Sequence, residues 1–266
     1  MAATKTAIVT GAASGIGKAF AARLIERGYR VVLADINDEN GEKVEKELGK
    51  NSIFQHCDVS NWESQVALFR KAYSWAGHID LFIANAGIEE QESFWQLPEH
   101  VTEEEVAKPN TKVVDVNLYS VLYGLKLFRH YTRLDKTPGQ ESRMVVTASL
   151  AGFYPFPAAP VYSVAKSGLV GLARSTGLKL ERDESILISV IAPGPVDTPI
   201  SEITKKYVPA EHFTPMDLMV KALDKVVDER LGGQVLECSN ANMYIREPLA
   251  FSDDNTKFLI GDMSRF

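Results

Sequence analysis

A tyrosine and a lysine suited to proton transfer lie four residues apart near the middle of the chain. Tyr162 and Lys166 follow Pro160 in an apolar segment, and proline is favoured at a helix start because its missing N–H would have no partner there. Residues four apart share one helical face. A nearby ammonium ion favours an ionised phenol, so we expect a lowered pKa for Tyr162 and proton exchange with a substrate oxygen near neutral pH. Ser149, at the end of the preceding apolar run, is placed to hold that oxygen.

The same residues allow two other interpretations. A tyrosine and a lysine at this spacing are usually a pair on a helix surface, without a catalytic role. Ser163 and Lys166 also match the Ser-x-x-Lys motif of penicillin-binding enzymes, but the companion Ser-Asp-Asn and Lys-Thr-Gly motifs are missing from the sequence. The choice therefore depends on what the rest of the chain supplies.

A glycine-rich turn near the N-terminus is suited to binding phosphate. It runs from Thr10 to Gly17, between the β-rich residues 6–9 and an amphipathic segment that ends at Arg27. Glycines let the backbone come close to a ligand, and the start of a helix attracts anions. The glycine spacing is wider than Gly-x-Gly-x-x-Gly, and structural turns share this composition. The strand, turn and helix context nevertheless favours a dinucleotide.

Asp35 indicates which dinucleotide. It ends the second apolar run roughly 20 residues past the glycines, where a carboxylate accepts hydrogen bonds from the ribose of NAD. A carboxylate there would repel the 2′-phosphate of NADP. Ser14, Ile36 and Asn37 stand where an NADP enzyme usually supplies arginine or lysine. We therefore expect NAD as the cofactor, with a helix cap as the alternative role for Asp35.

Strands and helices alternate along the whole chain. Apolar or β-rich runs predict strands at residues 6–9, 30–34, 52–56, 79–84, 144–147, 186–191 and 234–238. The segments between them predict helices at 37–48, 61–75, 111–134 and 216–228. Two more helices are predicted, one that ends at Arg27 and one that begins at Pro160. This alternation predicts an α/β fold, a Rossmann-type doubly wound parallel sheet of about seven strands with helices on both faces. We expect a single domain over residues 1–266.

Ligands of such sheets bind at the carboxyl ends of the strands. The segments that follow predicted strands, and so gather at this edge, are the glycine turn, Asp35, Asp58, Asn85, Ser149 and residues 193–198. Loops 88–110 and 195–215 would shape a substrate pocket, and the tail 240–266 has no assigned role. Apolar side chains in the loops predict a hydrophobic or aromatic substrate, although they could instead pack the loops or a subunit interface: Ile88, Phe94, Trp95, Phe153, Tyr154, Phe156 and Tyr207.

Composition excludes several classes of partner. A net charge of -6 gives no bulk attraction to nucleic acid or to an anionic membrane, and no run is apolar and long enough to span a bilayer. Five scattered histidines lack ligand spacing, so we expect no metal. Only two cysteines, Cys57 and Cys238, and no recognisable signal peptide predict the cytoplasm. The C-terminal Ser264-Arg265-Phe266 leaves the peroxisome as a minor alternative.

Together these motifs resemble the short-chain dehydrogenase/reductase family over almost the whole chain. Thr10–Gly17 is similar to its Thr-Gly-x-x-x-Gly-x-Gly turn, and residues 85–87 to its Asn-Asn-Ala-Gly motif, with Ala84 replacing the first asparagine. Residues 193–198 are similar to the loop that holds the nicotinamide carboxamide. Within the family, the chain length, residues 57–59 and residues 162–175 are most similar to the NAD-linked hydroxyprostaglandin dehydrogenases.

The resemblance implies a set of site residues. The catalytic tetrad would be Asn117, Ser149, Tyr162 and Lys166. The residues expected to bind NAD are Thr10, Gly11, Ser14, Gly15, Ile16, Gly17, Asp35, Ile36, Asp58, Val59, Asn85, Ala86, Gly87, Tyr162, Lys166, Pro193, Gly194, Val196 and Thr198. Tyr162 would take the alcohol proton, Ser149 would hold the oxygen, Lys166 would bind the nicotinamide ribose, and Asn117 would hold a water that relays protons.

The expected function is an NAD-dependent oxidoreductase that interconverts a secondary alcohol and its ketone. A biosynthetic ketoreductase and a non-catalytic NAD-binding or sensor protein remain as alternatives, the latter having no use for a complete tetrad. We also expect a homodimer or homotetramer, because segments 111–134 and 161–180 are apolar on more than the face that one sheet could cover.

Overall fold

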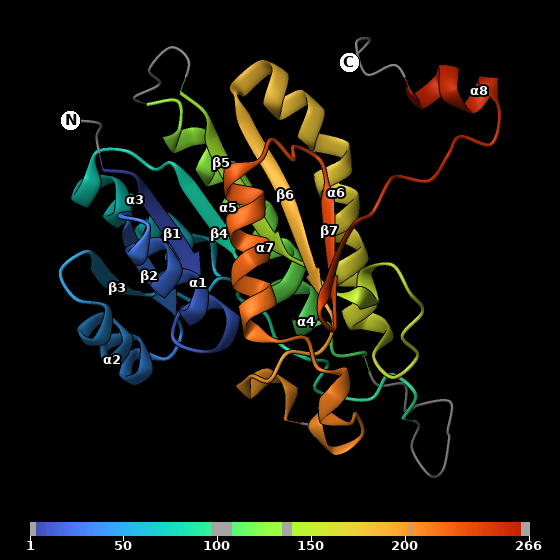
Figure 1. Cartoon of the computed structure of the whole chain (residues 1–266), viewed down its shortest axis with the longest axis horizontal. Coiled ribbons are helices and arrows are strands. Elements are labelled where there is room, and N and C mark those ends of the chain that lie inside the picture. The colour runs from blue at the N-terminus through green and yellow to red at the C-terminus, as the bar shows by residue number, and fades with distance from the viewer. Residues whose placement is uncertain (1–3, 97–107, 135–139, 203, 262–266) are drawn as a thin grey trace.

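Eight strands form one sheet in the order β3-β2-β1-β4-β5-β6-β7-β8 (Figure 1). The strands are β1 (Thr6–Thr10), β2 (Arg30–Asp35), β3 (Ser52–His56), β4 (Leu81–Ala84), β5 (Ser142–Thr147), β6 (Ile186–Pro193), β7 (Val235–Ser239) and β8 (Asn242–Ile245). The first seven are parallel, and β8 runs antiparallel to β7. The strand order reverses between β1 and β4, a position at which doubly wound sheets bind ligands.

This computed structural model describes residues 4–96, 108–134, 140–202 and 204–261. The middle of loop 88–110 and the peroxisome-like residues 264–266 therefore lie outside the described residues. Within the described ranges the chain has the single-domain Rossmann-like α/β architecture that the sequence predicts.

The prediction of about seven strands missed the edge strand β8. Asn240 adopts a left-handed conformation (φ 50°) and turns the chain back, so that Asn242–Ile245 pairs with β7. Asparagine tolerates this conformation better than most residues. The strand is short and largely exposed, so it lacks the continuous apolar run that marks buried strands such as β4.

Helices cover both faces of the sheet (Figure 1). They are α1 (Gly15–Glu26), α2 (Asp38–Leu48), α3 (Trp62–Ala76), α4 (Lys112–Val114), α5 (Ser120–Tyr131), α6 (Pro160–Glu184), α7 (Met216–Asp228) and α8 (Asp254–Thr256). One core cluster packs α3, α5 and α6 against one face, and a second packs α1, α2 and α7 against the other. Because neighbouring side chains of a strand point to opposite faces, Ala7 and Ile8 of β1 enter different clusters.

The helix predicted at 111–134 is interrupted. Between α4 and α5 the backbone forms one π-helical turn, Asp115–Tyr119, and Asn117 lies in its centre. Inside this stretch the Ser120 hydroxyl also donates to the carbonyl of Val116 (2.5 Å). Short π-helical turns often occur at functional sites, since they re-aim side chains. Apolar periodicity does not distinguish such a turn from a regular helix.

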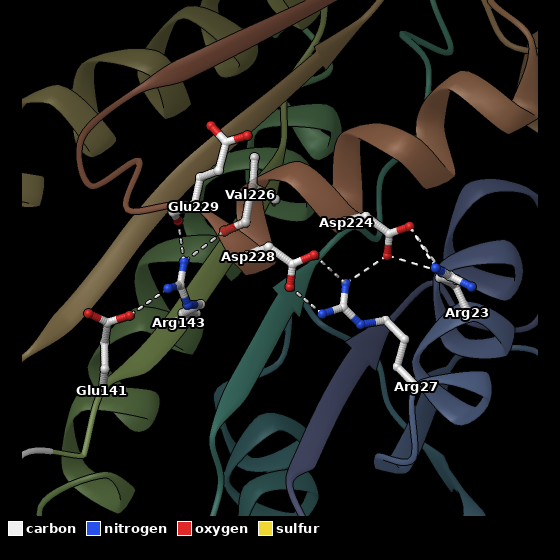
Figure 2. Close-up of polar contacts among 8 residues, drawn as sticks. All are labelled: Arg23, Arg27, Glu141, Arg143, Asp224, Val226, Asp228 and Glu229. Carbon is white, nitrogen blue, oxygen red and sulfur yellow. Dashed lines mark hydrogen bonds and ion pairs between the residues drawn. The ribbon is translucent and has the colours of Figure 1, made fainter.

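An ion-pair network joins α1 and α7 at the amino edge of the sheet (Figure 2). Asp224 accepts from Arg27 (2.7 Å) and from Arg23 (2.9 Å), and Arg27 also pairs with Asp228. Arg143, at the start of β5, donates to a carbonyl oxygen at the end of α7 (3.0 Å). These contacts hold the edge opposite the predicted site.

The C-terminal segment leaves the body after β8 (Figure 1). Arg174 on α6 donates to the carbonyls of Arg246 (3.0 Å) and Glu247 (3.1 Å), and beyond them α8 and a π-helical turn lie apart from the sheet. Leu249 is 92% exposed, and Phe251 is also exposed. Among the described residues, no helix has both the length and the apolar character needed to cross a membrane.

Candidate active site

The glycine turn after β1 packs tightly against two other loops. A Cβ on Gly11 (φ +66°) would lie 2.9 Å from Ala86 Cα, and one on Gly17 would lie 2.1 Å from the Gly11 carbonyl oxygen. Gly15 (φ +51°) faces Thr198, whose Cγ2 would be 3.0 Å from an added Cβ. The structure therefore brings the glycine turn, the turn after β4 and the loop after β6 together, as the sequence predicts.

The start of α1 is open to an anion. Ser14 is the N-cap residue, and its side chain makes no capping hydrogen bond. The first turn contains no acidic residue, so its N–H groups and the positive end of the helix dipole attract a phosphate without a competing carboxylate. A dinucleotide fits this turn, because the glycines let the protein backbone come close to the phosphates and the helix start supplies N–H donors.

Thr10 and Asn85 hold strand ends together. The Thr10 hydroxyl accepts from the N–H groups of Asn85 (3.0 Å) and Ala86 (3.1 Å). The Asn85 side chain donates to the Thr10 carbonyl (3.1 Å) and accepts from Thr147 (3.1 Å). These hydrogen bonds link the carboxyl ends of β1, β4 and β5 and fix their backbones relative to one another.

Asp35 sits at the carboxyl end of β2 and is not a helix cap. Its carboxylate accepts from the N–H groups of Ala13 (3.0 Å) and Asn37 (3.0 Å), whereas Asn37 itself caps α2. The neighbouring Ile36 is 64% exposed. Asp35 thus places a negative charge beside the glycine turn, at the edge predicted for the adenosine ribose.

Asp58 and Val59 border the same edge. The Asp58 carboxylate accepts from the N–H (2.9 Å) and hydroxyl (2.7 Å) of Ser60, which fixes the turn after β3. Val59 is buried beneath this turn.

In the loop after β6, the N–H of Gly194 donates to the carbonyl of Cys238 (2.8 Å).

The rest of the loop after β6 is also firmly placed. The N–H of Thr198 donates to the Ser201 hydroxyl (3.1 Å), and the carbonyl of Pro195 accepts from Thr214 (2.7 Å). Val196 and Thr198 are buried. The part of the loop between Pro193 and Thr198 is therefore held against the sheet and the glycine turn.

Lys166 is buried on α6 beside Tyr162. Its Nζ donates to the carbonyl of Thr147 (2.9 Å) and lies 5.5 Å from the centre of the Tyr162 ring. Burial lowers the pKa of Lys166 to about 8. Thr147 was not among the predicted site residues, and its role follows from its place at the end of β5.

Tyr162 differs from the prediction in its ionisation. Burial raises the pKa of Tyr162, a hydrogen bond with Ser149 opposes that rise, and the charge of Glu89 adds to it. The predicted lowering of the Tyr162 pKa by Lys166 is therefore wrong, because removing a phenolate from water disfavours the charged form. Ser149 also begins the short 3₁₀ turn Leu150–Gly152, where its hydroxyl accepts from the N–H of Ala151 (3.2 Å).

Asn117 fixes the loop that passes the buried lysine. Its side chain accepts from the N–H of Ile88 (2.8 Å) and donates to the carbonyl of Ile88 (2.9 Å). A Cβ on Gly87 would lie 3.2 Å from Asn117 Oδ1 and 3.7 Å from Lys166 Nζ. The four predicted tetrad residues, Asn117, Ser149, Tyr162 and Lys166, are therefore brought together at one end of the sheet.

Sequence reasoning missed two acidic residues of this site. Glu90 accepts the N–H of Tyr162 (2.9 Å), and Glu89 accepts from the hydroxyl of Thr204 (3.4 Å). A signal was present, since both directly follow the turn after a buried strand. In the described ranges, no group of three or more histidine, cysteine, aspartate or glutamate residues is placed to hold a metal ion.

The aromatic residues predicted to line the substrate pocket are largely at the surface. Those that are exposed are Phe94, Trp95, Tyr154, Phe156 and Tyr207. Trp95 donates through its ring N–H to the carbonyl of Pro157 (2.6 Å), which ties the loop after β4 to the loop after β5. Phe153 and Ile88 instead pack against the core.

A family model described as short chain dehydrogenase matches residues 5–208. The chain belongs to this family. A short-chain dehydrogenase/reductase (prx6) of Penicillium rubens is 32% identical over 88% of this chain and 83% of its own length. The 15-hydroxyprostaglandin dehydrogenase [NAD(+)] of Mus musculus is 34% identical over 76% of this chain and 71% of its own length.

A solved structure extends the similarity to three dimensions. The alcohol dehydrogenase from the archaeon Thermococcus sibiricus, complexed with 5-hydroxy-NADP, has a TM-score of 0.72 and 25% identity, covering 93% of this chain and all of its own. Membership of the family makes the chain an oxidoreductase of the class that uses a nicotinamide cofactor on alcohols or ketones. The family resemblance expected from the sequence, including the similarity to hydroxyprostaglandin dehydrogenases, is confirmed.

Proposed function

We propose that this protein is an NAD-dependent dehydrogenase that interconverts a secondary alcohol and its ketone, with Tyr162 as the acid and base. The observation that carries this proposal is the convergence of Tyr162, Ser149 and Lys166 beside the turn after β4, which itself packs on the glycine turn. General acid–base groups need this kind of hydrogen-bonded placement. A binding protein or sensor would not require a hydroxyl pair next to a buried lysine.

Each side chain would have a distinct task. Tyr162 takes the alcohol proton during oxidation and returns it during reduction, while Ser149 donates to the substrate oxygen and stabilises its charge. Lys166, with a pKa of about 8, carries a positive charge near neutral pH that favours the phenolate and can bind a ribose hydroxyl. A bound nicotinamide supplies the hydride acceptor or donor.

Asn117 would support these groups by holding the backbone. Its two hydrogen bonds to Ile88 fix the loop that passes Lys166, and the water expected to relay protons would lie beside these groups. This role follows the family resemblance and the spacing around Gly87.

NAD is the proposed cofactor because of Asp35. The residues that would hold it are the glycine turn, Asp35 and the following Ile36, Asp58 and Val59, residues 85–87, Tyr162 and Lys166, and the loop from Pro193 to Thr198. The Asp35 carboxylate is anchored by two backbone N–H groups, so it cannot easily turn away from a 2′-phosphate. The NAD-linked relative from Mus musculus agrees with this choice, whereas the Thermococcus sibiricus structure contains an NADP derivative.

The proposed substrate is hydrophobic or aromatic. Exposed aromatic side chains lie on the loops after β4, β5 and β6, and Trp95 joins the first two of these loops near the start of α6. Such surfaces suit an apolar small molecule. We also propose a homodimer or homotetramer and, from the two free buried cysteines, a cytoplasmic location.

The test is turnover of a panel of secondary alcohols and ketones, followed by cofactor absorbance with NAD and with NADP. Tyr162→Phe should abolish most turnover, because general acid–base catalysis is worth roughly 10²–10⁴-fold, and should leave NAD binding nearly intact. Lys166→Ala should lower both rate and NAD affinity. If Tyr162→Phe kept most of the wild-type rate on a responsive substrate, the proposed role of Tyr162 would be wrong.

A further inference from the structure

Glu89 lies between two residues that are hydrogen-bonded to the proposed catalytic residues. Ile88, on one side, is held at both backbone groups by Asn117. Glu90, on the other side, accepts the N–H of Tyr162 (2.9 Å). The backbone before Glu89 is thus held by Asn117, and the residue after it is anchored to Tyr162 through its side chain, so Glu89 belongs to a segment tied to the site on both sides.

The Glu89 carboxylate also reaches the loop on the other side of the site. It accepts from the Thr204 hydroxyl (3.4 Å), which belongs to the segment after β6. Glu89 is half-buried, and burial raises its pKa while the Thr204 bond opposes the rise. Its charge raises the pKa of Tyr162, so the carboxylate and the phenol are within electrostatic range of each other.

Neither glutamate has a basic partner in the part of the chain that the structure describes. The nearby Lys205 pairs instead with Asp197 (2.7 Å) and Glu202 (2.8 Å). Glu90 Oε1 is buried, and no hydrogen bond reaches it from any described residue. Half-buried carboxylates without a cation are unfavourable, so this end of the site is suited to receive positive charge from outside the chain.

We propose that Glu89 determines substrate specificity by selecting hydrophobic secondary alcohols, or their ketones, that carry a protonated amine close to the reacting carbon. This inference rests on the proposed function and adds the charge of the substrate to it. An ammonium group can form charge-assisted hydrogen bonds with Glu89, and these are roughly twice as strong as neutral ones. A substrate carboxylate would meet a like charge.

An ammonium ion would also help the reaction itself. By neutralising Glu89, it removes a negative charge that opposes ionisation of Tyr162. The preference should therefore be visible in kcat as well as in KM. A glutamate that only braced the two loops would contribute equally to substrates of every charge.

The experiment compares three aryl alkyl secondary alcohols of matched size, one with a primary amine, one with a methyl group in its place and one with a carboxylate. The wild-type enzyme, Glu89→Gln and Glu92→Gln are assayed at pH 7.5 with NAD. The amide oxygen introduced by Glu89→Gln can still accept from Thr204, and Glu92 is an exposed residue of the same loop outside the site. Near-ultraviolet circular dichroism verifies that each variant is folded.

We expect the wild-type enzyme to favour the amine over the methyl analogue by at least about tenfold in kcat/KM, which corresponds to about 1.4 kcal/mol. Glu89→Gln should bring that ratio close to one and should move the acidic limb of the pH profile for the methyl analogue to lower pH. Glu92→Gln should keep the wild-type ratio. Competitive inhibition by an aryl alkyl ammonium without a hydroxyl should weaken in Glu89→Gln alone.

The inference is overturned if the wild-type enzyme prefers the methyl or carboxylate analogue, or if Glu89→Gln keeps the preference for the amine. If Glu89→Gln does not fold, the inference is still tested by the kcat/KM values of the wild-type enzyme for the three alcohols and by its inhibition by the ammonium compound. Failure of the proposed function has a different result, namely no Tyr162-dependent turnover of any of the three alcohols.

Discussion

At the scale of single residues, burial decides the ionisation of the proposed catalytic pair. Lys166 and Tyr162 are both removed from water, so the pKa of the lysine falls to about 8 and that of the phenol rises. Both changes favour the neutral form of each group. The Tyr162 phenol is therefore neutral near pH 7, and a bound substrate or cofactor would have to supply the charge that favours the phenolate.

Asp35 gives the sharpest test of cofactor choice. Like charges about 4 Å apart repel by roughly 4 kcal/mol at an effective dielectric of 20, and solvent at this open edge reduces that figure. We expect NAD to be favoured over NADP by at least about tenfold in kcat/KM, and Asp35→Ala to erode that ratio. Steady-state kinetics with both cofactors measure it. A wild-type enzyme that works better with NADP would rule the prediction out.

At the scale of elements, the π-helical turn between α4 and α5 aims Asn117 at the loop after β4. In Gly87→Ala the new Cβ would lie 3.2 Å from Asn117 Oδ1, so either the asparagine or the loop has to move. We expect kcat/KM to fall by about tenfold or more, equivalent to about 1.4 kcal/mol, with only a small change in Tm. Kinetics and thermal unfolding of the same preparation separate the two effects. Unchanged kinetics would show that this contact does not matter.

The contact between α1 and α7 depends on Asp224. Burial alone would raise the pKa of Asp224, but hydrogen bonds from Arg23 and Arg27 outweigh it and the pKa is lowered from its usual 3.8. A lowered pKa in the folded state means that the stabilisation is present above the usual value and is lost as pH falls through the lowered one.

Asp224→Asn should therefore lower the free energy of unfolding by about 1 kcal/mol at pH 7, a typical size for a partly exposed ion pair. The difference from wild type should disappear in strongly acidic solution. Urea unfolding at several pH values measures this. Glu26→Gln is the matched control, since Glu26 is more exposed and, among the residues that the structure describes, forms an ion pair with Arg23 alone (3.0 Å). An equal loss in both variants would contradict a special role for Asp224.

At the scale of the whole molecule, α6 presents an uncovered stripe on its outer side. Val164 is 61% exposed and Leu178 is 62% exposed, and between them no neighbouring atom of the described segments lies within 4 Å of a Cβ added to Gly171. Small residues at the centre of such a stripe permit close helix packing. We expect a dimer or tetramer in solution, and Leu178→Glu should shift it toward the monomer. Light scattering at micromolar concentration measures this, and a monomeric wild type would refute the expectation.

The sequence by itself determined the fold class and the neighbourhood of the site. Strand periodicity and the turns at strand ends were enough to predict a Rossmann-type parallel sheet, because in such a sheet every strand delivers its carboxyl end to one edge. The structure confirms this arrangement and brings the predicted tetrad together. The roles of these residues stay predictions.

Only the tertiary structure decided the features that depend on contacts between distant segments. The π-helical turn, the burial that raises the pKa of Tyr162, and the edge strand β8 leave no local pattern in the sequence. Glu89 is a partial case: it follows the turn after a buried strand, but in the sequence it is one of many acidic residues in an irregular loop. Its position beside Tyr162 arises because Asn117, 28 residues further along the chain, holds the backbone of Ile88. Hydrogen bonds of this range depend on the packed fold, so sequence periodicity could not reveal them.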